Sequence, residues 1–471
     1  MQTALSQCAG RERRLASVAL LFGAVLSGCG SPSDVERPLP HVANVAVADG
    51  EGGIFRALEI DLDAPGSLTI DYWAPGVERL RLDVAASARR HEVWLPRLRA
   101  ERQYSYEITP RSSSGQTGAV TTGIFGTGAL PADVAALNYA VAEGSPTAPL
   151  LFVEVVEAFS GFLGAIIVDG TGEVVWYYRT TGRTFGSTRL DNGNFVILDV
   201  GEKLVEVTPD GREAASISSL DYGGLHHAIT RTPQNTVLFV AYDAQQVGAE
   251  NVVGEALWEW NPATGSVVKR WSSFDHLDWN TDRGAASTAS NWLHANGLSI
   301  GPRGNVVLSL RALNQVISLA PDFESIEWRL GGPNATIAVA GDALFLSQHD
   351  AQELAGDRVL LFDNGGPDRP YSRGLELQLD RTGGTAEMVW EYAPATPNFA
   401  TILGSTRRLG NGNTVVHFGP AIGVFDATGP TMTVEVDASG GVVWRLVAGE
   451  SLQRAFRGTP LDAIAGEVTV D

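Results

Sequence analysis

Apolar and polar residues alternate with a period of two in many short runs of the chain. Residues 68–72 (LTIDY) and 80–84 (LRLDV) are clear examples, and this alternation is typical of strands with one buried face. The 53 glycines and 23 prolines favour tight turns between such strands over long helices. The pattern predicts an all-β protein.

The segment 41–128 has the pattern of a small β unit. Its Leu98, Tyr104 and Tyr106 give a Leu–x5–Tyr–x–Tyr spacing ahead of a Ser- and Gly-rich turn. This spacing resembles fibronectin type III and immunoglobulin-like sandwiches, in which a tyrosine hydroxyl bonds back to the backbone upstream. We therefore expect a β-sandwich domain over residues 41–128.

A repeated unit begins near residue 148. One half of it is a hairpin with an Asp- or Gly-containing turn, whose second strand usually ends in tryptophan. Copies occur at 168–176, 207–214, 260–271, 319–328, 379–390 and 436–444. The other half is a hairpin that turns on Gly, Asn or a close substitute, because these residues tolerate positive φ. Its copies lie at 192–194, 233–235, 303–305, 356–357 and 411–413.

Two such hairpins make one four-stranded sheet, and intact units recur about every 50–60 residues. This period indicates a β-propeller, because a β-helix would need a much shorter one. The tryptophan-type hairpins predict six blades, with five or seven left open, over residues 129–471. The predicted fold class is therefore all-β, with an N-terminal immunoglobulin/fibronectin type III-like sandwich followed by a six-bladed β-propeller.

Composition narrows the classes of function. The 471 residues are 44% hydrophobic, which is enough to build a core and excludes general disorder. A formal charge of −20 argues against nucleic acid as a partner, because such binding needs dense Lys and Arg. It does not exclude an anionic substrate held in one local basic pocket.

Residues 1–28 have the pattern of a lipoprotein signal peptide. Arginines at 11, 13 and 14 precede an apolar run at 15–26 that is too short to span a bilayer. Leu-Ser-Gly-Cys follows at 26–29 and resembles a bacterial lipobox. This resemblance implies acylation of Cys29 and a tether over 29–40. An ordinary secretory signal is the alternative.

Cleavage at this site removes Cys8 and commits Cys29 to lipid, so the mature chain would have no disulfide. We expect a lipid-anchored protein of the bacterial cell envelope that faces the periplasm or the cell exterior. Gly30 and Ser31 carry no inner-membrane retention signal of the Asp type, which favours an outer membrane.

Eight histidines are candidates for chemistry. His41 and His91 fall in the predicted sandwich and His276 falls in a polar loop, so we expect them to be solvent-facing or structural. The other five fall in the propeller hairpins, and these are His226, His227, His294, His349 and His417.

The hairpin that contains His294 also positions an arginine. Folding this hairpin symmetrically about the turn 301–304 puts Arg311 directly opposite His294, with Cβ atoms about 5 Å apart. A neighbouring cation lowers the pKa of an imidazole. We therefore expect a neutral His294 ring.

Three of the histidines share a register. His227, His294 and His349 lie five, seven and about six residues before their turns, one blade apart. Equivalent positions on the inner strands of a propeller converge on the central channel, a concave site of the kind that ligands use. Buried structural histidines and a three-histidine zinc site are the alternatives. Arg311 argues against a metal, and a channel of His and Arg suits an oxyanion such as sulfate or phosphate.

Several short motifs occur in the order seen in the arylsulfotransferase (aryl sulfate sulfotransferase) family, and the resemblance covers roughly residues 150–445. They are LHHAI at 225–229, WLHAN at 292–296, LSLR at 308–311, WRLGG at 328–332, QHDA at 348–351 and LFDNG at 361–365. The resemblance implies a six-bladed propeller after a small β-sandwich. It also implies sulfuryl transfer between phenols without a nucleotide donor, and we expect no cofactor and no metal.

By this resemblance, His349 is the nucleophile that becomes transiently sulfated. His294 and Arg311 would hold the sulfuryl oxygens. His227 would act as an acid or base, or as a further stabiliser of the transition state.

Two other histidines are candidates for contacting the substrate, His226 and His417. Whether His226 or its neighbour His227 faces the channel stays open, because adjacent strand residues point in opposite directions. The family often has His-His-Asp where this chain has Ala228, so any orienting role of that carboxylate is lost.

The predicted activity is a ping-pong transfer of a sulfuryl group from a phenolic sulfate ester to a phenol. The expected partners are small phenolic donors and acceptors and, through Cys29, a membrane. The alternative from another class is a non-catalytic propeller lipoprotein that binds a ligand or scaffolds an assembly. Hydrolysis, with water as the acceptor, would use the same residues as transfer.

Overall fold

The computed structural model describes residues 39–50, 52–420, 427–449 and 453–470. Regular structure in these ranges is almost entirely β-strand, which confirms the all-β class. The helical elements are short, namely α1 (Ala132–Ala135) and the 3-10 turns η1 (Ser219–Tyr222), η2 (Ser273–Asp275), η3 (Arg311–Leu313) and η4 (Gly341–Ala343). Within the described ranges, no helix has both the length and the hydrophobicity to span a bilayer. The predicted signal peptide and Cys29 lie outside these ranges.

The first sheet has the strand order β31-β3-β2-β4-β5, and β1 also pairs with β2. Its strands are β1 (Val42–Asp49), β2 (Arg56–Trp73), β3 (Arg79–Trp94), β4 (Gln103–Arg111), β5 (Thr121–Gly126) and β31 (Val468–Val470). The Tyr104 hydroxyl accepts a hydrogen bond from the Arg99 amide at 2.8 Å. This is a bond between a tyrosine hydroxyl and the backbone upstream of it, as the tyrosine spacing predicts. Because β31 pairs with β3, the last described strand belongs to this sheet.

The remaining sheets of the described residues are six in number and antiparallel. Four of them follow chain order, with four strands each. They comprise β10 (Thr184–Arg189), β11 (Phe195–Asp199), β12 (Lys203–Val207) and β13 (Glu213–Ser218); β14 (Leu225–Arg231), β15 (Val237–Val247), β16 (Glu250–Asn261) and β17 (Ser266–Ser272); β18 (Ala295–Ile300), β19 (Val306–Leu310), β20 (Gln315–Leu319) and β21 (Ile326–Leu330); and β22 (His349–Leu354), β23 (Arg358–Asp363), β24 (Arg373–Asp380) and β25 (Thr385–Tyr392).

The last two sheets combine strands from distant parts of the chain. One has the order β26 (Ser405–Arg408), β27 (Thr414–Phe418), β28 (Met432–Val436), β29 (Val442–Ala448) and then β6 (Tyr139–Gly144). The other has the order β30 (Arg454–Leu461), β7 (Leu150–Glu157), β8 (Gly164–Asp169) and β9 (Val174–Arg179). Early and late segments are therefore hydrogen-bonded to each other in two neighbouring sheets.

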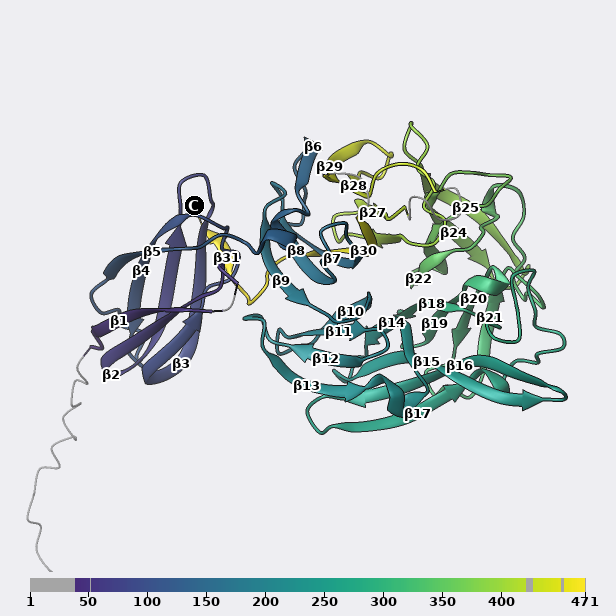
Figure 1. The fold of residues 1–471 in the computed structure, drawn as a ribbon, viewed down its shortest axis with the longest axis horizontal. Coiled ribbons are helices and arrows are strands. Elements are labelled where there is room, and N and C mark those ends of the chain that lie inside the picture. Colours follow the sequence, from purple (N-terminus) through teal and green to yellow (C-terminus); the bar gives the residue numbers. More distant parts are fainter. Residues whose placement is uncertain (1–38, 51, 421–426, 450–452, 471) are drawn as a thin grey trace, which may run out of the picture. The chain divides into compact units, whose positions relative to one another are not determined.

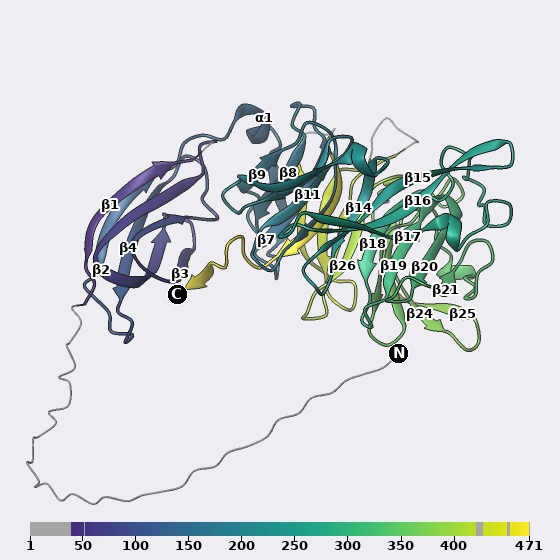
Figure 2. The same cartoon turned by 90° about the horizontal axis from the view of Figure 1, so that it is seen from below.

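Figure 1 shows these sheets arranged in a ring, as in a propeller, and Figure 2 shows the same sheets from the side. The first strand of each sheet, β30, β10, β14, β18, β22 or β26, contacts the first strand of the next sheet, and these contacts close a circle. The predicted hairpins of both types are present as adjacent antiparallel strands. Local turn chemistry thus accounts for the strand pairs from which the ring is built.

The repeated tryptophan has a packing role between neighbouring sheets. Trp176 of β9 is 1% exposed, and its ring contacts Phe195 of the next sheet at a centroid distance of 5.1 Å. Its indole N–H donates to the Pro209 carbonyl at 2.9 Å. A large ring of this kind fills the wedge between two splayed sheets. The indole N–H groups of Trp271, Trp328, Trp390 and Trp444 have no hydrogen-bond partner among the described residues, so the recurring tryptophans share the packing and not the hydrogen bond.

Candidate active site

The inner strands of three successive sheets lose regular pairing at the predicted histidines. His227 and His294 have φ angles of 53° and 55°, and Asp350, which follows His349, has a φ of 56°. The ladder register shifts at each of these places. Left-handed backbone is costly for residues other than glycine and is concentrated at functional sites. Here it turns the histidines out of the normal alternation of the strand.

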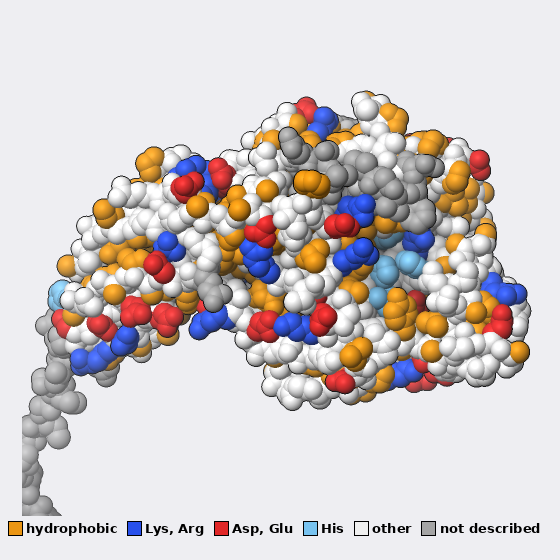
Figure 3. All heavy atoms as spheres, in the orientation of Figure 1, with side chains coloured by type: hydrophobic (Ala, Val, Ile, Leu, Met, Phe, Trp, Pro, Cys, Tyr) orange, Lys and Arg blue, Asp and Glu red, His pale blue; other side chains and the backbone are white. Residues whose placement is uncertain are grey.

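The three histidines converge around one aromatic ring. The His227 and His294 rings lie 4.7 Å apart by centroid. Phe456 of β30 lies 6.2 Å from His227 and 6.0 Å from His349, and Phe185 of β10 stacks on His227 at 5.2 Å. Figure 3 shows histidine side chains gathered in a hollow on one face, beside basic side chains. The residues that the sequence predicts to share a site are thus brought together, with His349 only 1% exposed.

The predicted pairing of His294 with Arg311 is confirmed. The Arg311 amide donates to the His294 carbonyl at 3.0 Å, next to the pair Ala295–Leu310. The Arg311 guanidinium donates through Nη2 to the Thr401 carbonyl at 3.4 Å. Its Nε has no hydrogen-bond partner among the described residues. Arg311 therefore keeps donor capacity for an oxyanion beside His294.

The tautomer of His349 follows from its hydrogen bonds. Its Nδ1 lies 2.7 Å from Oδ1 of Asn364 and 3.2 Å from the Ser347 carbonyl, and both of these are acceptors. The Asn364 amide is fixed in this orientation because its Nδ2 donates to the carbonyls of Ala400 and Leu403. His349 must therefore carry its proton on Nδ1 when neutral, which leaves the Nε2 lone pair free.

His226 and His227 have different surroundings. The His226 ring is stacked on Tyr242 at 4.0 Å, and His226 is 3% exposed. Its Nε2 lies 2.8 Å from Oε2 of Glu255, and its Nδ1 lies 2.9 Å from Nδ1 of His227. His227, not His226, is therefore the member of the pair that lies with His294 and Phe456.

Glu255 of β16 supplies a carboxylate that sequence reasoning missed. Its second oxygen accepts the Ala295 amide at 2.9 Å, so both oxygens are used and the side chain is fixed. Ala228 itself supplies no carboxylate, but Glu255 on another strand contacts His226. The signal in the sequence is a single glutamate inside the apolar run 252–258.

Electrostatics keeps the three rings neutral. Burial, followed by the neighbouring histidines, lowers the pKa of His227 well below its usual range. Burial, followed by Arg311, does the same to the pKa of His349. The same two causes lower the pKa of His294 to about 3. Burial also lowers the pKa of Arg311. Neutral rings beside an arginine suit attack on, and binding of, an anionic ester.

The remaining histidines lie elsewhere. His417 of β27 is 1% exposed, and its Nδ1 lies 2.8 Å from the Thr433 hydroxyl, so it is packed inside its own sheet. His41 is exposed beside Asp63. His91 bonds to backbone carbonyls, and His276 stacks on Trp271. Among the residues that the structure describes, no group of three or more His, Cys, Asp or Glu side chains is arranged to hold a metal ion.

Several solved structures match this chain at low identity and with TM-scores below 0.5. A streptogramin B lyase is 13% identical, with 77% of this chain and 94% of that chain covered and a TM-score of 0.35. A virginiamycin B lyase from Staphylococcus aureus is 12% identical, with 65% and 87% covered and a TM-score of 0.33. An apocarotenoid oxygenase from Synechocystis is 9% identical, with 91% and 97% covered and a TM-score of 0.34.

A search among curated proteins finds no match. The protein-family model described as Arylsulfotransferase (ASST) matches residues 147–448. This range is more than half of the 471 residues and contains the converging histidines and Arg311. The chain belongs to the arylsulfotransferase family.

Proposed function

We propose that this protein transfers a sulfuryl group from a phenolic sulfate ester to a phenol in two steps, through a sulfated His349. The family membership supports an arylsulfotransferase-like activity in general. The observation that carries the specific proposal is the hydrogen bond from His349 Nδ1 to Asn364, which frees Nε2. A neutral imidazole with a free Nε2 is a competent nucleophile at neutral pH.

His294 and Arg311 hold the sulfuryl oxygens in this proposal. Their main chains are bonded, and the Arg311 guanidinium has an unused N–H. Donors that are already in place where charge develops lower the barrier without having to reorganise during the reaction. Arg311 supplies the fixed positive charge, and the neutral His294 ring adds a dipole rather than a second cation.

Glu255, His226 and His227 form a proton relay in this proposal. Glu255 accepts the Nε2 proton of His226, so the Nδ1 of His226 accepts the Nδ1 proton of His227. Nε2 of His227 then exchanges a proton with the phenol oxygen. The negative charge of a bound ester favours protonation of His227, and the Glu255 carboxylate stabilises the resulting cation through His226.

The two steps balance in atoms and protons. Before the first step, His227 takes up a proton from solvent at Nε2 when the anionic ester binds. In the first step, Nε2 of His349 forms a bond to sulfur while the bond from sulfur to the phenolic oxygen breaks, and the leaving phenolate takes that proton from His227. In the second, an acceptor phenol gives its proton to His227 and its oxygen attacks sulfur, which breaks the nitrogen–sulfur bond. His349 is then free, and the kinetics are ping-pong.

The proposal is tested with the purified full-length chain and 4-nitrophenyl sulfate, with and without phenol, beside His349→Ala. We expect nitrophenol release that depends on phenol, is absent from the variant and yields a sulfated His349 detectable by mass spectrometry after rapid quenching. Release that is equally fast without phenol would indicate hydrolysis. Phenol-dependent release that survives His349→Ala would overturn the assignment of the nucleophile.

We also propose the finer description of the architecture. The six ring sheets would be the blades of a six-bladed propeller within residues 129–471, and strands β1 to β5, within 41–128, would form an immunoglobulin/fibronectin type III-like sandwich that β31 joins. Acylation of Cys29 would anchor the protein in the cell envelope. Intact mass of the membrane-extracted protein tests the anchor, because three acyl chains add a distinctive increment that Cys29→Ser abolishes.

A further inference from the structure

A second cavity lies at the other end of the same inner strands. Each of these strands starts near the histidines and ends at the cavity, as β14 does from His227 to Arg231. Four residues along a strand correspond to about 13 Å. The cavity has a volume of about 360 Å³ and is lined by residues from β10, β14, β18, β22, β26 and β30, but by none of the converging histidines.

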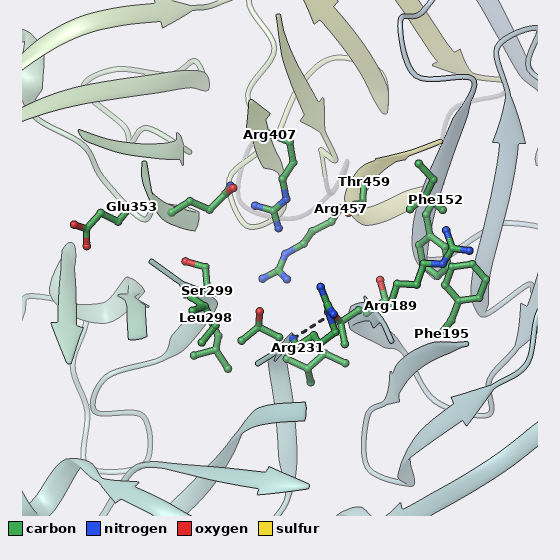
Figure 4. A pocket seen from close by; sticks show the side chains of 17 residues that line it. Phe152, Arg189, Phe195, Arg231, Leu298, Ser299, Glu353, Arg407, Arg457 and Thr459 are labelled. Atoms are coloured by element: carbon green, nitrogen blue, oxygen red, sulfur yellow. Dashed lines mark hydrogen bonds between the residues drawn. The ribbon is translucent and has the colours of Figure 1, made fainter. Parts of the chain in front are cut away.

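Four arginines line this cavity, namely Arg189, Arg231, Arg407 and Arg457. Figure 4 shows Arg407 and Arg457 extending toward its centre. Acidic side chains lie near all four of them. Arg407 and Arg457 share the single carboxylate of Asp350, and Arg231 pairs with Asp191.

Arg189 uses its guanidinium on backbone carbonyls, of Ala463 and Ile464 at 2.6 Å each. The lining carboxylate, Glu353, is already engaged by Arg303 and Arg381, which lie outside the lining. Besides Asp191 and Asp350, the charges of Glu467 and Asp462 act on Arg189 and that of Glu154 acts on Arg457. What the four arginines offer an anion is therefore hydrogen-bond donors and not an excess of positive charge.

One further carboxyl group lies near Arg457. Glu154 is 1% exposed and accepts hydrogen bonds from the Ser187 hydroxyl at 2.6 Å and the Gly186 amide at 3.0 Å. Burial raises its pKa, although the charge of Arg457 opposes this. Glu154 is thus a further acidic neighbour of Arg457.

Arg457 has unused donor capacity. Its side chain is 3% exposed, and its Nε lies 3.5 Å from Asp350 without a hydrogen-bond partner. One Nη donates to the Asn296 carbonyl at 2.9 Å. A buried guanidinium with an unsatisfied N–H is costly, and an oxyanion in the cavity would satisfy it with charge-assisted hydrogen bonds.

The rest of the lining suits an organic ligand. Thr459 adds a hydroxyl group to the lining, and Phe152, Phe195 and Leu298 provide apolar surface. A volume of about 360 Å³ lies within the range of small-molecule sites, about 300–1,000 Å³. We propose that this cavity is a second binding site, for a small organic oxyanion with a carboxylate or sulfonate on an apolar body. It is separate from the histidine site and does not depend on the proposed transfer reaction.

The test is calorimetric titration of the full-length protein with benzoate, benzenesulfonate and the neutral analogue benzyl alcohol. Arg407→Gln should weaken benzoate binding about 10- to 100-fold, the effect of losing a charged hydrogen bond. Arg408→Gln is the matched control. It lies on the same strand with the same 24% side-chain exposure, but it pairs with Glu376 and does not line the cavity. It should leave binding unchanged.

His349→Ala separates the two sites. Benzoate binding that persists in His349→Ala and weakens in Arg407→Gln supports the cavity. Binding lost in His349→Ala would place the anion at the histidines and overturn the proposal. So would wild-type affinity in Arg407→Gln, equal affinity for benzyl alcohol, or no saturable heat with either anion. If Arg407→Gln fails to fold, as judged by circular dichroism, Arg231→Gln replaces it, because Arg231 is 39% exposed.

Discussion

Oδ1 of Asn364 lies 2.7 Å from Nδ1 of His349, and the amide that carries it is held by two backbone carbonyls on its other side. An asparagine fixed in this way specifies the tautomer of a histidine without adding charge. The proposed nucleophile is therefore set by a residue that follows it by 15 positions and never touches the reacting sulfur.

Asn364→Leu should remove this control. We expect kcat to fall on the order of 10²-fold, as when a general acid–base partner is lost, because both His349 tautomers become accessible. Asn364→Asp keeps an acceptor toward Nδ1 of His349 and should retain more activity. Because the added carboxylate raises the pKa of His349, the acid limb of the pH–rate profile should move to higher pH. Steady-state kinetics of both variants across pH measure this. Equal losses without a pH shift would show that Asn364 only supports the fold.

Glu255→Gln should impair proton transfer selectively. The amide keeps the shape of the side chain but removes the charge that stabilises a protonated His227. We expect kcat for phenyl sulfate to fall on the order of 10²-fold. The loss should be much smaller for 4-nitrophenyl sulfate, whose leaving group needs little protonation. The ratio of the two rates is the readout, and an equal fall for both substrates would argue against a relay through His226.

The pH profile of kcat/KM should show an unusually low acid limb. Burial, and then Arg311, lower the pKa of His349, so the reactive neutral ring persists as the pH falls below the ordinary histidine value of about 6.5. Arg311→Gln removes the second cause and should move the acid limb upward, besides slowing the reaction. An acid limb of the wild-type enzyme at or above pH 6.5 would contradict this electrostatic account.

Asp363 should be essential for stability. It is fully buried and pairs with Arg369 and Arg373, and its Oδ1 also accepts the Leu346 amide at 3.0 Å. Breaking a buried ion pair from one side costs about 3–5 kcal/mol, so Asp363→Asn should lower the free energy of unfolding by about this amount. The control variant is Asp368→Asn, which makes the same change at an exposed residue in the segment that follows β23. Urea unfolding of the two variants should therefore differ.

The sequence carries enough information for the hairpins because their turns are local. It also predicts the contact of His294 with Arg311. That prediction is correct only because two shifts in the pairing register of the strands cancel each other. Near the turn, Ile300 pairs with Val306, one residue away from the symmetric register, and a shift between Ala295 and Gly297 restores it. A prediction from turn symmetry alone succeeds here because the bulge compensates for the longer turn.

The support around the histidines was harder to predict. Asn364 follows β23 in the hairpin that begins at His349, Glu255 is on β16 in the sheet of His226, and Phe456 is on β30 of another sheet. Of the three, only Phe456 needs the closed ring to reach the site. Nothing in the spacing of the histidines points to these residues. A buried acid in an apolar run, such as Glu255, is the one local signal, because such a charge needs a partner. The cavity arginines are equally non-local.

The pairing of β30 with β7 has a consequence for how the protein is made. Arg454 and Glu157, which are 297 residues apart, meet in this pair, and β30 also carries Phe456 and Arg457. A nascent chain folds from its N-terminus. The ring of sheets therefore cannot close, and one edge of β7 stays unpaired, until β30 has been translated. Closing so long a loop is slow. The histidine pocket and the arginine cavity are therefore finished by the same late docking event, and a chain that stops before residue 454 would lack both.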